Sequence, residues 1–254
     1  MTTTMFVSGQ QSSDSVEVSP APSAGAGSPT VPCPFNDTKW QLTVLEWKPR
    51  FRTLSGVNAN HQQLCPSPEW ATYIRDDVLP WLVEQADPGH EMLEIGPGPG
   101  AATDWLRHRV KRLVAFEIDE DAAHRLSTRY SGSNVEVAVG NGADLPYEAD
   151  SFDSVGTFTM LHHVPTLALQ RSILAEALRV LRPGGVLIGS DSLGSTGLHD
   201  FHADDTYNPI DPATLLVLFQ ALGFERITVR VDGILRFVAH KPDAIERCAE
   251  RSYD

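Results

Sequence analysis

The sequence contains no lysine or arginine before Lys39 and only 3 cysteines in 254 residues. An N-terminus without a basic start and an apolar centre does not resemble a signal peptide. The cysteines, Cys33, Cys65 and Cys248, lack the paired spacing of a zinc site and are typical of thiols in a reducing compartment. No apolar run approaches the roughly 20 residues that span a bilayer. These absences predict a cytoplasmic protein.

Basic residues are scarce throughout, because 20 lysines and arginines face 33 acidic residues and leave a net charge of −13. Nucleic acids and anionic membranes are bound by lysine and arginine, so we expect neither as a partner. A small-molecule substrate is favoured instead. The hydrophobic fraction of 41% suffices for the core of one enzyme domain. Nothing in the sequence predicts an oligomeric state.

The N-terminal third divides into two parts by composition. Residues 1–37 are rich in serine, threonine, proline, alanine and glycine without an apolar period, which predicts a disordered tail. Residues 40–51 and 68–84 carry apolar side chains at helical spacing. We therefore expect a folded domain over residues 38–254 that opens with a helical segment at 38–90, in which residues 55–66 are a polar connection.

After Glu91 the sequence alternates between candidate strands and candidate helices, which predicts an α/β fold with a mainly parallel sheet covered on both faces. The expected strands are 92–95, 113–117, 135–139, 154–158, 186–190, 226–231 and 235–239. The expected helices are 101–109, 120–130, 167–181 and 212–221. Asp211 and Gly223 are the cap signals of the last helix. The last two strands are joined only at Asp232-Gly233, so we expect an antiparallel hairpin.

The glycine-rich stretch after the first of these strands is the strongest functional signal, Glu94-Ile-Gly-Pro-Gly-Pro-Gly100. Glycines at 96, 98 and 100 allow the backbone to approach a ligand where a Cβ atom would collide. A tight turn without a ligand is the alternative, but a strand before and a helix after favour a nucleotide-like cofactor. The turn by itself is also compatible with a nicotinamide dinucleotide.

Two acidic residues narrow the choice of cofactor. Glu94 precedes the first glycine by two positions, where a carboxylate suits a cationic group better than a pyrophosphate. Glu117 ends the second strand, where a carboxylate can accept both hydrogen bonds of a ribose diol. That second position serves either a nicotinamide dinucleotide or an adenosyl group.

Six motifs follow one another in order: the glycine turn, Glu117, Gly140-Asn-Gly-Ala-Asp-Leu-Pro-Tyr147, Ser151-Phe-Asp-Ser-Val155, Leu161-His-His-Val164 and Leu181-Arg-Pro-Gly-Gly185. Together they make residues 91–242 resemble the class I S-adenosylmethionine-dependent methyltransferases. The resemblance implies a Rossmann-like, seven-stranded, mostly parallel sheet of order 3-2-1-4-5-7-6, with strand 7 antiparallel. It implies a methyltransferase domain over 38–254 whose segment 38–90 forms a helical lid.

The resemblance implies that S-adenosylmethionine is the cofactor and that its methionine end lies against Glu94 and the glycine turn. Glu117 would hold the ribose hydroxyls and Ile118 would pack on the adenine. Family members often have Gly-Asp-Ala at the third strand end, where this chain has Gly140-Asn141-Gly142. An asparagine oxygen can still accept a bond from the adenine amino group. The remaining cofactor contacts implied in this chain are Gly142 and Phe158.

Candidate catalytic residues follow the fourth and fifth strands. Methyl transfer to a hydroxyl releases a proton, for which a neutral histidine is the usual acceptor. His162 and His163 lie where an open α/β sheet places its site, and His163 is favoured as the base. Asp191 would orient a histidine or bind a substrate hydroxyl. The structural alternatives are a helix cap or loop packing for the histidines and a solvent-facing loop position for Asp191.

The loop that follows the fifth strand is crowded with polar side chains, and substrate lids are often built from such loops. His199, His202, Asp205 and Tyr207 are the candidate substrate-binding residues. A polar lid is favoured over a divalent metal held by imidazole and carboxylate ligands, which is the alternative. Trp47, Phe51 and His61 are further candidates for the acceptor pocket wall, although a structural role in the core is favoured for each of them taken separately.

We therefore expect an O-methyltransferase that acts on a hydroxyl of a sugar or secondary metabolite. One alternative is a C-methyltransferase that acts on a quinone, polyketide or lipid. The other is a binding module that keeps the cofactor site without methyl transfer.

Overall fold

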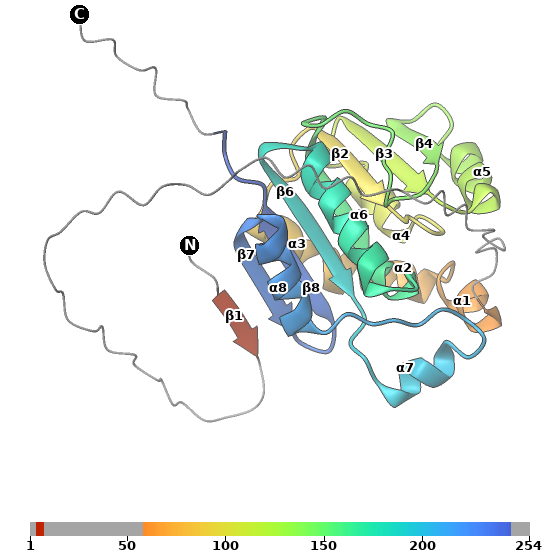
Figure 1. The fold of residues 1–254 in the computed structure, drawn as a ribbon. Helices are drawn as coiled ribbons and strands as arrows, with labels where there is room; N and C mark the ends of the chain where they lie inside the picture. The colour runs from red at the N-terminus through yellow and green to blue at the C-terminus, as the bar shows by residue number, and fades with distance from the viewer. Residues whose placement is uncertain (1–3, 8–57, 245–254) are drawn as a thin grey trace, which may run out of the picture. The chain divides into compact units, whose positions relative to one another are not determined.

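The structure is a computed structural model that describes residues 4–7 and 58–244. The expected helix at 40–51, with Trp47 and Phe51, lies outside the described residues. The strands are β1 (Thr4–Val7), β2 (Glu91–Ile95), β3 (Arg112–Glu117), β4 (Val135–Val139), β5 (Phe152–Phe158), β6 (Leu181–Asp191), β7 (Glu225–Val231) and β8 (Leu235–His240). Strands β2 to β8 form at the positions that the alternating sequence pattern predicts (Figure 1).

These strands form one sheet of order β1-β7-β8-β6-β5-β2-β3-β4. Strand β8 runs antiparallel to β6 and β7, and the other pairs are parallel. Numbered from β2, the order is 3-2-1-4-5-7-6, as the resemblance implied, and the β7–β8 hairpin is confirmed. Strand β1 falls within the segment expected to be disordered and adds a parallel edge strand beside β7.

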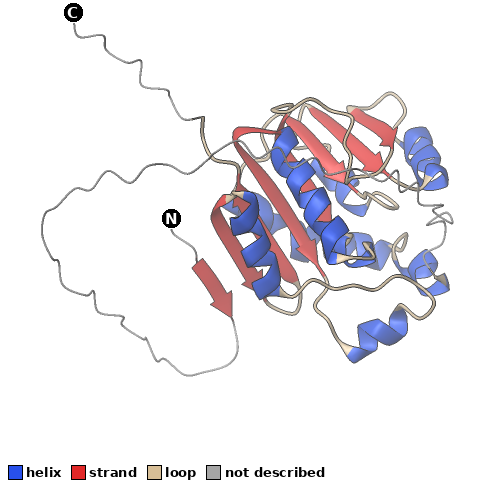
Figure 2. Ribbon diagram, viewed as in Figure 1, coloured by secondary structure: helices blue, strands red, loops and turns tan. Residues whose placement is uncertain are grey.

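Along the chain, the helices of the described residues all lie between strand β1 and strand β8 (Figure 2). They are α1 (Ala59–Leu64), α2 (Pro68–Tyr73), a π-helical turn (Ile74–Val78), α3 (Leu79–Gln85), α4 (Ala101–Leu106), α5 (Glu120–Arg129), a 3₁₀ turn (Leu161–His163), α6 (Leu167–Val180), α7 (Thr196–Phe201) and α8 (Pro212–Leu222). None of these helices is long and apolar enough to cross a membrane.

Two short helices form where the sequence predicted only polar connections. Helix α1 lies within residues 55–66 and is capped by Asn58, whose side chain accepts the His61 N–H. Helix α7 lies within the polar loop after β6 and is capped by Ser195, whose hydroxyl accepts the Leu198 N–H. Both predictions failed because a side-chain cap starts a helix without any apolar period. The caps expected for α8, Asp211 and Gly223, are confirmed.

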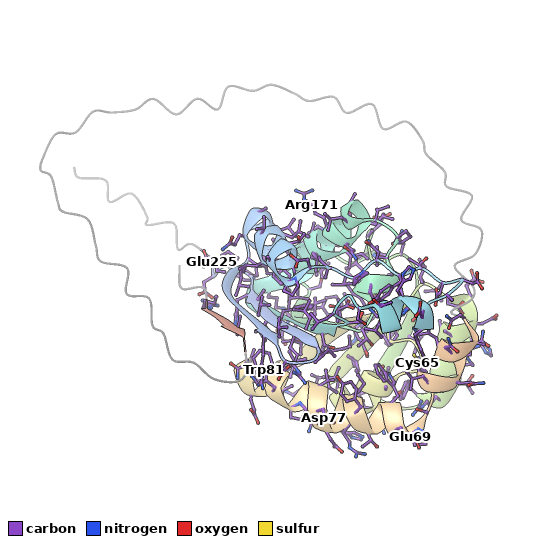
Figure 3. The ribbon with its side chains drawn as sticks, turned by 90° about the horizontal axis from the view of Figure 1, so that it is seen from below. Cys65, Glu69, Asp77, Trp81, Arg171 and Glu225 are labelled. Atoms are coloured by element: carbon purple, nitrogen blue, oxygen red, sulfur yellow. The ribbon has the colours of Figure 1, made fainter. Side chains whose placement is uncertain are left out.

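Helices cover both faces of the sheet. In Figure 1, α6 and α8 lie in front of the sheet, and α3 and α4 lie behind it. Figure 3 shows the two layers from below, with Cys65, Glu69, Asp77 and Trp81 on the N-terminal helical side and Arg171 on the α6 side. A buried apolar cluster fills the space on each face. The carboxyl ends of β2, β3, β5 and β6 meet at one edge, because these strands are mutually parallel. That edge is where an open parallel sheet binds its ligands.

Candidate functional site

The turn between β2 and α4 is shaped by its three glycines. Gly96, Gly98 and Gly100 have φ angles of +69°, +55° and +87°, a region that favours glycine. A Cβ atom at Gly96 would overlap the Met160 side chain, and one at Gly100 would lie 2.6 Å from the Tyr130 hydroxyl. A Cβ atom at Gly98 would meet no described atom within 4 Å. Packing therefore requires the outer two glycines, and the middle one borders open space.

Glu94 is a buried acid at the carboxyl end of β2, with 1% of its surface exposed. Its Oε2 accepts a hydrogen bond from Thr103 Oγ1 at 2.6 Å, and no described cationic side chain pairs with it. Burial is the main effect and raises the pKa of Glu94 to about 7; the Thr103 hydrogen bond lowers this pKa, and repulsion from Glu117 raises it. A cationic ligand beside the glycine turn would supply the missing partner for this carboxylate.

Glu117 holds the glycine turn to the end of β3. Its Oε2 accepts the Gly98 N–H at 3.0 Å, and its Oε1 accepts the N–H groups of Ile118 and Asp119 at 2.9 and 3.1 Å. A carboxylate has about four lone-pair positions, so at least one stays available for a ribose hydroxyl. The neighbouring Ile118 side chain is 45% exposed and offers an apolar surface to a flat ring.

Asn141, Gly142 and Phe158, the other predicted cofactor residues, are engaged in a turn or in packing contacts within the protein. Asn141 Oδ1 accepts the Ala143 N–H at 3.0 Å and so closes its own turn after β4. Gly142 packs so tightly that a Cβ atom would lie 2.7 Å from Cγ2 of Ile95. The Phe158 ring, 6% exposed, belongs to the apolar cluster on the α3 and α4 side of the sheet. The end of β5 therefore places Phe158 in the core.

The predicted catalytic residues come together at the ends of β5 and β6. His162 is buried, and its Nδ1 lies 2.5 Å from Oδ1 of Asp191, which is fully buried. The Asp191 Oδ2 atom also accepts the His162 backbone N–H at 3.2 Å. The ring of His163 lies 4.1 Å from that of His162, centroid to centroid. Asp191 is thus a buried histidine partner rather than a solvent-facing loop residue.

The α7 loop adds some of its predicted residues to this group and leaves others outside. His202 is buried, and Tyr207 stacks on its ring with centroids 4.2 Å apart. Asp205 lies between two histidines, with Oδ2 at 3.2 Å from His61 Nδ1 and Oδ1 at 4.0 Å from His163 Nδ1. His199 is exposed on α7, and its ring centroid is 6.3 Å from that of Tyr207.

His61 completes the group from α1 and is the residue to which the sequence assigned no firm role. It is 5% exposed, and its ring centroid lies 4.4 Å from that of His202 and 4.8 Å from that of His163. We name His61, His162, His163 and His202 the histidine cluster. Three segments distant in sequence supply it, so no local spacing could have revealed it.

The imidazoles of the histidine cluster disfavour one another's protonation. Burial, followed by repulsion from His202, lowers the pKa of His61 to about 4. Burial and the neighbouring histidines likewise place the pKa of His163 well below its usual value. Burial lowers the pKa of His202 as well. These three rings are therefore neutral at pH 7.

Hydrogen bonds join the loops that carry the cluster. Asn208 N donates to the His162 carbonyl at 2.7 Å, and Gln170 Nε2 donates to the carbonyls of Leu161 and Asn208, each at 2.8 Å. Met160, two residues before His162, packs against Gly96 of the glycine turn. His162 and His163 follow β5, and the glycine turn follows the neighbouring strand β2. Both therefore lie at the same edge of the sheet.

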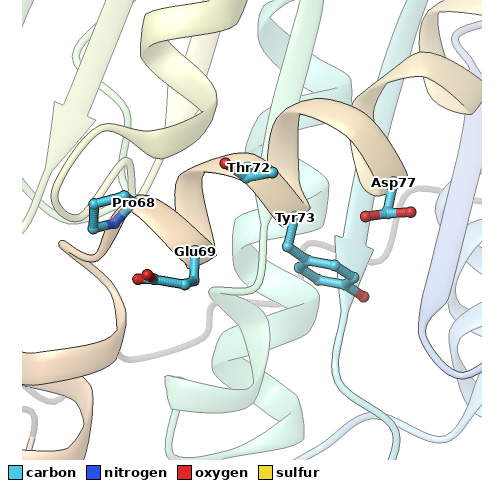
Figure 4. A pocket seen from close by; sticks show the side chains of 5 residues that line it. All are labelled: Pro68, Glu69, Thr72, Tyr73 and Asp77. Atoms are coloured by element: carbon cyan, nitrogen blue, oxygen red, sulfur yellow. The ribbon is translucent and has the colours of Figure 1, made fainter.

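A shallow depression elsewhere contains none of these residues. It lies along α2 and the π-helical turn and is lined by Pro68, Glu69, Thr72, Tyr73 and Asp77 (Figure 4). Its lining contains no histidine, glycine or buried acid, so we do not assign it to the candidate site.

Residues 93–189 match the family model described as "Methyltransferase domain". A "Probable S-adenosylmethionine-dependent methyltransferase" of Mycolicibacterium smegmatis is 33% identical over 160 residues, which cover 60% of this chain and 59% of that protein. A "24-methylenesterol C-methyltransferase 2" of rice, Oryza sativa, is 32% identical over 46% of this chain and 33% of its own length. This chain thus matches less than two thirds of the length of these relatives.

A solved structure shares the fold. The crystal structure of an S-adenosylmethionine-dependent methyltransferase from Methanosarcina mazei aligns with a TM-score of 0.55 at 20% identity, over 66% of this chain and 99% of that one. The sheet order and the glycine turn with its two acids are consistent with these matches to methyltransferases. Residues 93–189 thus match a methyltransferase domain, and the described residues have the fold of a solved S-adenosylmethionine-dependent methyltransferase.

Proposed function

We propose that this protein transfers the methyl group of S-adenosylmethionine to a hydroxyl of a small polar acceptor, a sugar or a secondary metabolite. The observation that carries the proposal is the buried His162–Asp191 pair with His163 beside it, next to the glycine turn. Imidazoles and carboxylates at the carboxyl edge of the sheet suit a polar acceptor better than an apolar one.

The chemistry asks the protein to align the acceptor oxygen with the methyl group and to receive one proton. His163 is the favoured base, because its side chain is 25% exposed, whereas those of His61 and His162 are 6% and 5% exposed. The ring is neutral at pH 7 and holds a proton weakly. A weak base suffices here, since the acceptor oxygen becomes strongly acidic as its bond to the methyl carbon forms.

The second candidate is a C-methyltransferase acting on a quinone, polyketide or lipid. The similarity to the sterol C-methyltransferase of rice favours it. An already acidic carbon nucleophile needs less help from a base, so this candidate predicts that loss of His163 is tolerated. A cofactor-binding module without methyl transfer is the third candidate, and the retained Glu94 and Glu117 weigh against such decay.

The test is an acceptor screen with S-adenosylmethionine that carries a deuterated methyl group. Hydroxylated sugars, phenols, quinones and lipids are incubated with the protein, and the products are identified by mass and by the position of the label. We expect an O-methyl product whose rate of formation falls at least tenfold in His163→Ala and stays unchanged in the control His124→Ala, an exposed histidine on α5. Label on carbon with an active His163→Ala variant would establish the C-methyltransferase instead.

A further inference from the structure

The histidine cluster is larger than the proposed base requires. One proton acceptor and one orienting carboxylate would serve methyl transfer to a hydroxyl, yet four imidazoles meet here. One ring nitrogen can be chosen from each of the four imidazoles so that all four nitrogen atoms lie within 4.8 Å of one another. Three of the four residues are at most 5% exposed, although histidine is more often found partly exposed. The surplus imidazoles need an explanation of their own.

The hydrogen bonds of three imidazoles fix which nitrogen carries the proton. The Nδ1 atoms lie 2.5 Å from Asp191 Oδ1 in His162 and 2.6 Å from the Leu198 carbonyl in His202. In His61, Nδ1 lies 3.1 Å from Asn58 Oδ1. Each of these partners is an oxygen acceptor, so each Nδ1 carries the hydrogen. The lone pair of each ring is therefore on Nε2.

The lone pair on His202 faces an interior without a described donor. The Nε2 atom of His202 is buried and has no hydrogen-bond partner among the described residues. An imidazole whose Nδ1–H binds a carboxylate, an amide oxygen or a backbone carbonyl is the arrangement seen around metal-bound histidines. The carboxylate–histidine pair at Asp191 and the carbonyl–histidine pair at Leu198 are two such arrangements in one cluster.

His163 differs from the other three rings. Its Nδ1 atom is buried without a hydrogen-bond partner and lies 4.0 Å from Asp205 Oδ1, beyond bonding distance. No acceptor therefore fixes the orientation of this ring, and its side chain is the most exposed of the four. Three of the four imidazoles are therefore oriented by an oxygen acceptor, and the fourth, His163, is not.

We propose that His61, His162 and His202 bind a divalent transition metal through their Nε2 atoms, with His163 next to the open coordination position. Imidazole ligands suit Zn²⁺, Fe²⁺, Co²⁺, Ni²⁺ and Cu²⁺, whereas Mg²⁺ prefers oxygen ligands. Three protein ligands with one open position are typical of catalytic rather than structural sites. The chemical consequence rests on the proposed function: an acceptor hydroxyl bound at the open position would be more acidic, and His163 would receive its proton.

Metal binding can be measured without methyl transfer. The full chain is stripped with chelator, then titrated with Zn²⁺ or Co²⁺ by calorimetry, and metal retained after gel filtration is counted by mass spectrometry. Co²⁺ also gives visible absorption bands whose intensity distinguishes a four- or five-coordinate site from hexa-aquo Co²⁺. We expect one tightly bound Zn²⁺ or Co²⁺ per chain and no competition from millimolar Mg²⁺.

Variants locate the site. His202→Ala and His61→Ala should weaken Zn²⁺ binding at least 100-fold, and Asp191→Asn should weaken it about 10–100-fold by freeing the His162 ring. The exposed control His199→Ala and the base variant His163→Ala should keep the metal. Circular dichroism and S-adenosylmethionine binding show that each variant is folded.

Zn²⁺ binding that survives His202→Ala in a folded protein would contradict the site, and so would loss of the metal in His163→Ala. An intact metal site in a protein that methylates carbon would overturn only the proposed acceptor. Methylation of a hydroxyl by protein that binds no metal would overturn only the metal.

Discussion

Among single residues, Glu94 makes the stability of the protein without cofactor depend on pH. Its pKa is raised from 4.5 to about 7 by burial, so between these values the folded chain holds a proton that the unfolded chain has released. Stability contributed by the protonated acid is therefore lost as pH rises from about 4.5 to about 7. A cationic cofactor beside the ionised carboxylate would offset this loss.

We expect Glu94→Gln to remove this pH dependence. The amide oxygen can still accept the hydrogen bond of the Thr103 hydroxyl. As the pH rises from 4.5 to 8, the free energy of unfolding of the variant should therefore increase by about 3 kcal/mol relative to that of the parent. Urea unfolding of both proteins without cofactor at the two pH values measures the difference. Parallel pH profiles for parent and variant would mean that Glu94 is already ionised in the folded protein.

Glu117 is expected to contribute directly to cofactor affinity. Glu117→Ala removes the acceptor for a ribose hydroxyl and the bond to the Gly98 N–H, and should weaken S-adenosylmethionine binding by about 1–3 kcal/mol. The matched control is Glu120→Ala, an exposed acid in the first turn of α5. Calorimetric titration measures both variants, and equal affinities would show that the ribose is held elsewhere.

Single residues were predictable where the sequence itself marks their place. Glu94 is the second-last residue and Glu117 the last residue of strands with strong apolar patterns, so their position at the carboxyl edge followed from the strand assignment. His61 could not be found this way, because 101 positions separate it from His162 and only the folded chain brings their rings together. For Phe158, the position at the end of a strand was predictable from the sequence. The face of the sheet on which its ring lies was not predictable.

At the level of elements, the alternation of apolar strands and amphipathic helices made β2 to β8 predictable, whereas α1 and α7 were missed. Each of these helices has 6 residues, too few for a helical period to be read. Contacts between the two segments hold them. Asn58 Nδ2 donates to the carbonyls of Phe201 and Ala203 at 2.6 and 3.1 Å, and Asn60 Nδ2 donates to Phe201 at 2.9 Å.

Asn58→Ala should loosen α1 and α7 together. The change removes the α1 cap and both bonds to the α7 segment, and we expect a loss of about 1–2 kcal/mol of local stability. Hydrogen exchange of peptides covering residues 58–66 and 196–206 measures the effect. Asn60→Ala is the control, because it loses one exposed bond and no cap. Equal protection in both variants would show that other contacts hold these helices.

At the level of the whole molecule, the segment before residue 38 is expected to contribute little to stability. Strand β1 adds four residues to the edge of the sheet, and the seven strands from β2 to β8 already form the complete methyltransferase order. Removal of residues 1–37 should lower the melting temperature by no more than about 2–4 °C, which corresponds to roughly 1 kcal/mol in a domain of this size. A much larger decrease in a calorimetric scan would reveal substantial burial by this segment.

The central claim is that the glycine turn with Glu94 and Glu117 binds S-adenosylmethionine rather than a dinucleotide. Calorimetric titration of the full chain with S-adenosylmethionine, S-adenosylhomocysteine and NAD tests it most directly. We expect one molecule of either adenosyl compound to bind per chain, more weakly in Glu117→Ala, and no heat with NAD. Binding of NAD without binding of S-adenosylmethionine would contradict the claim.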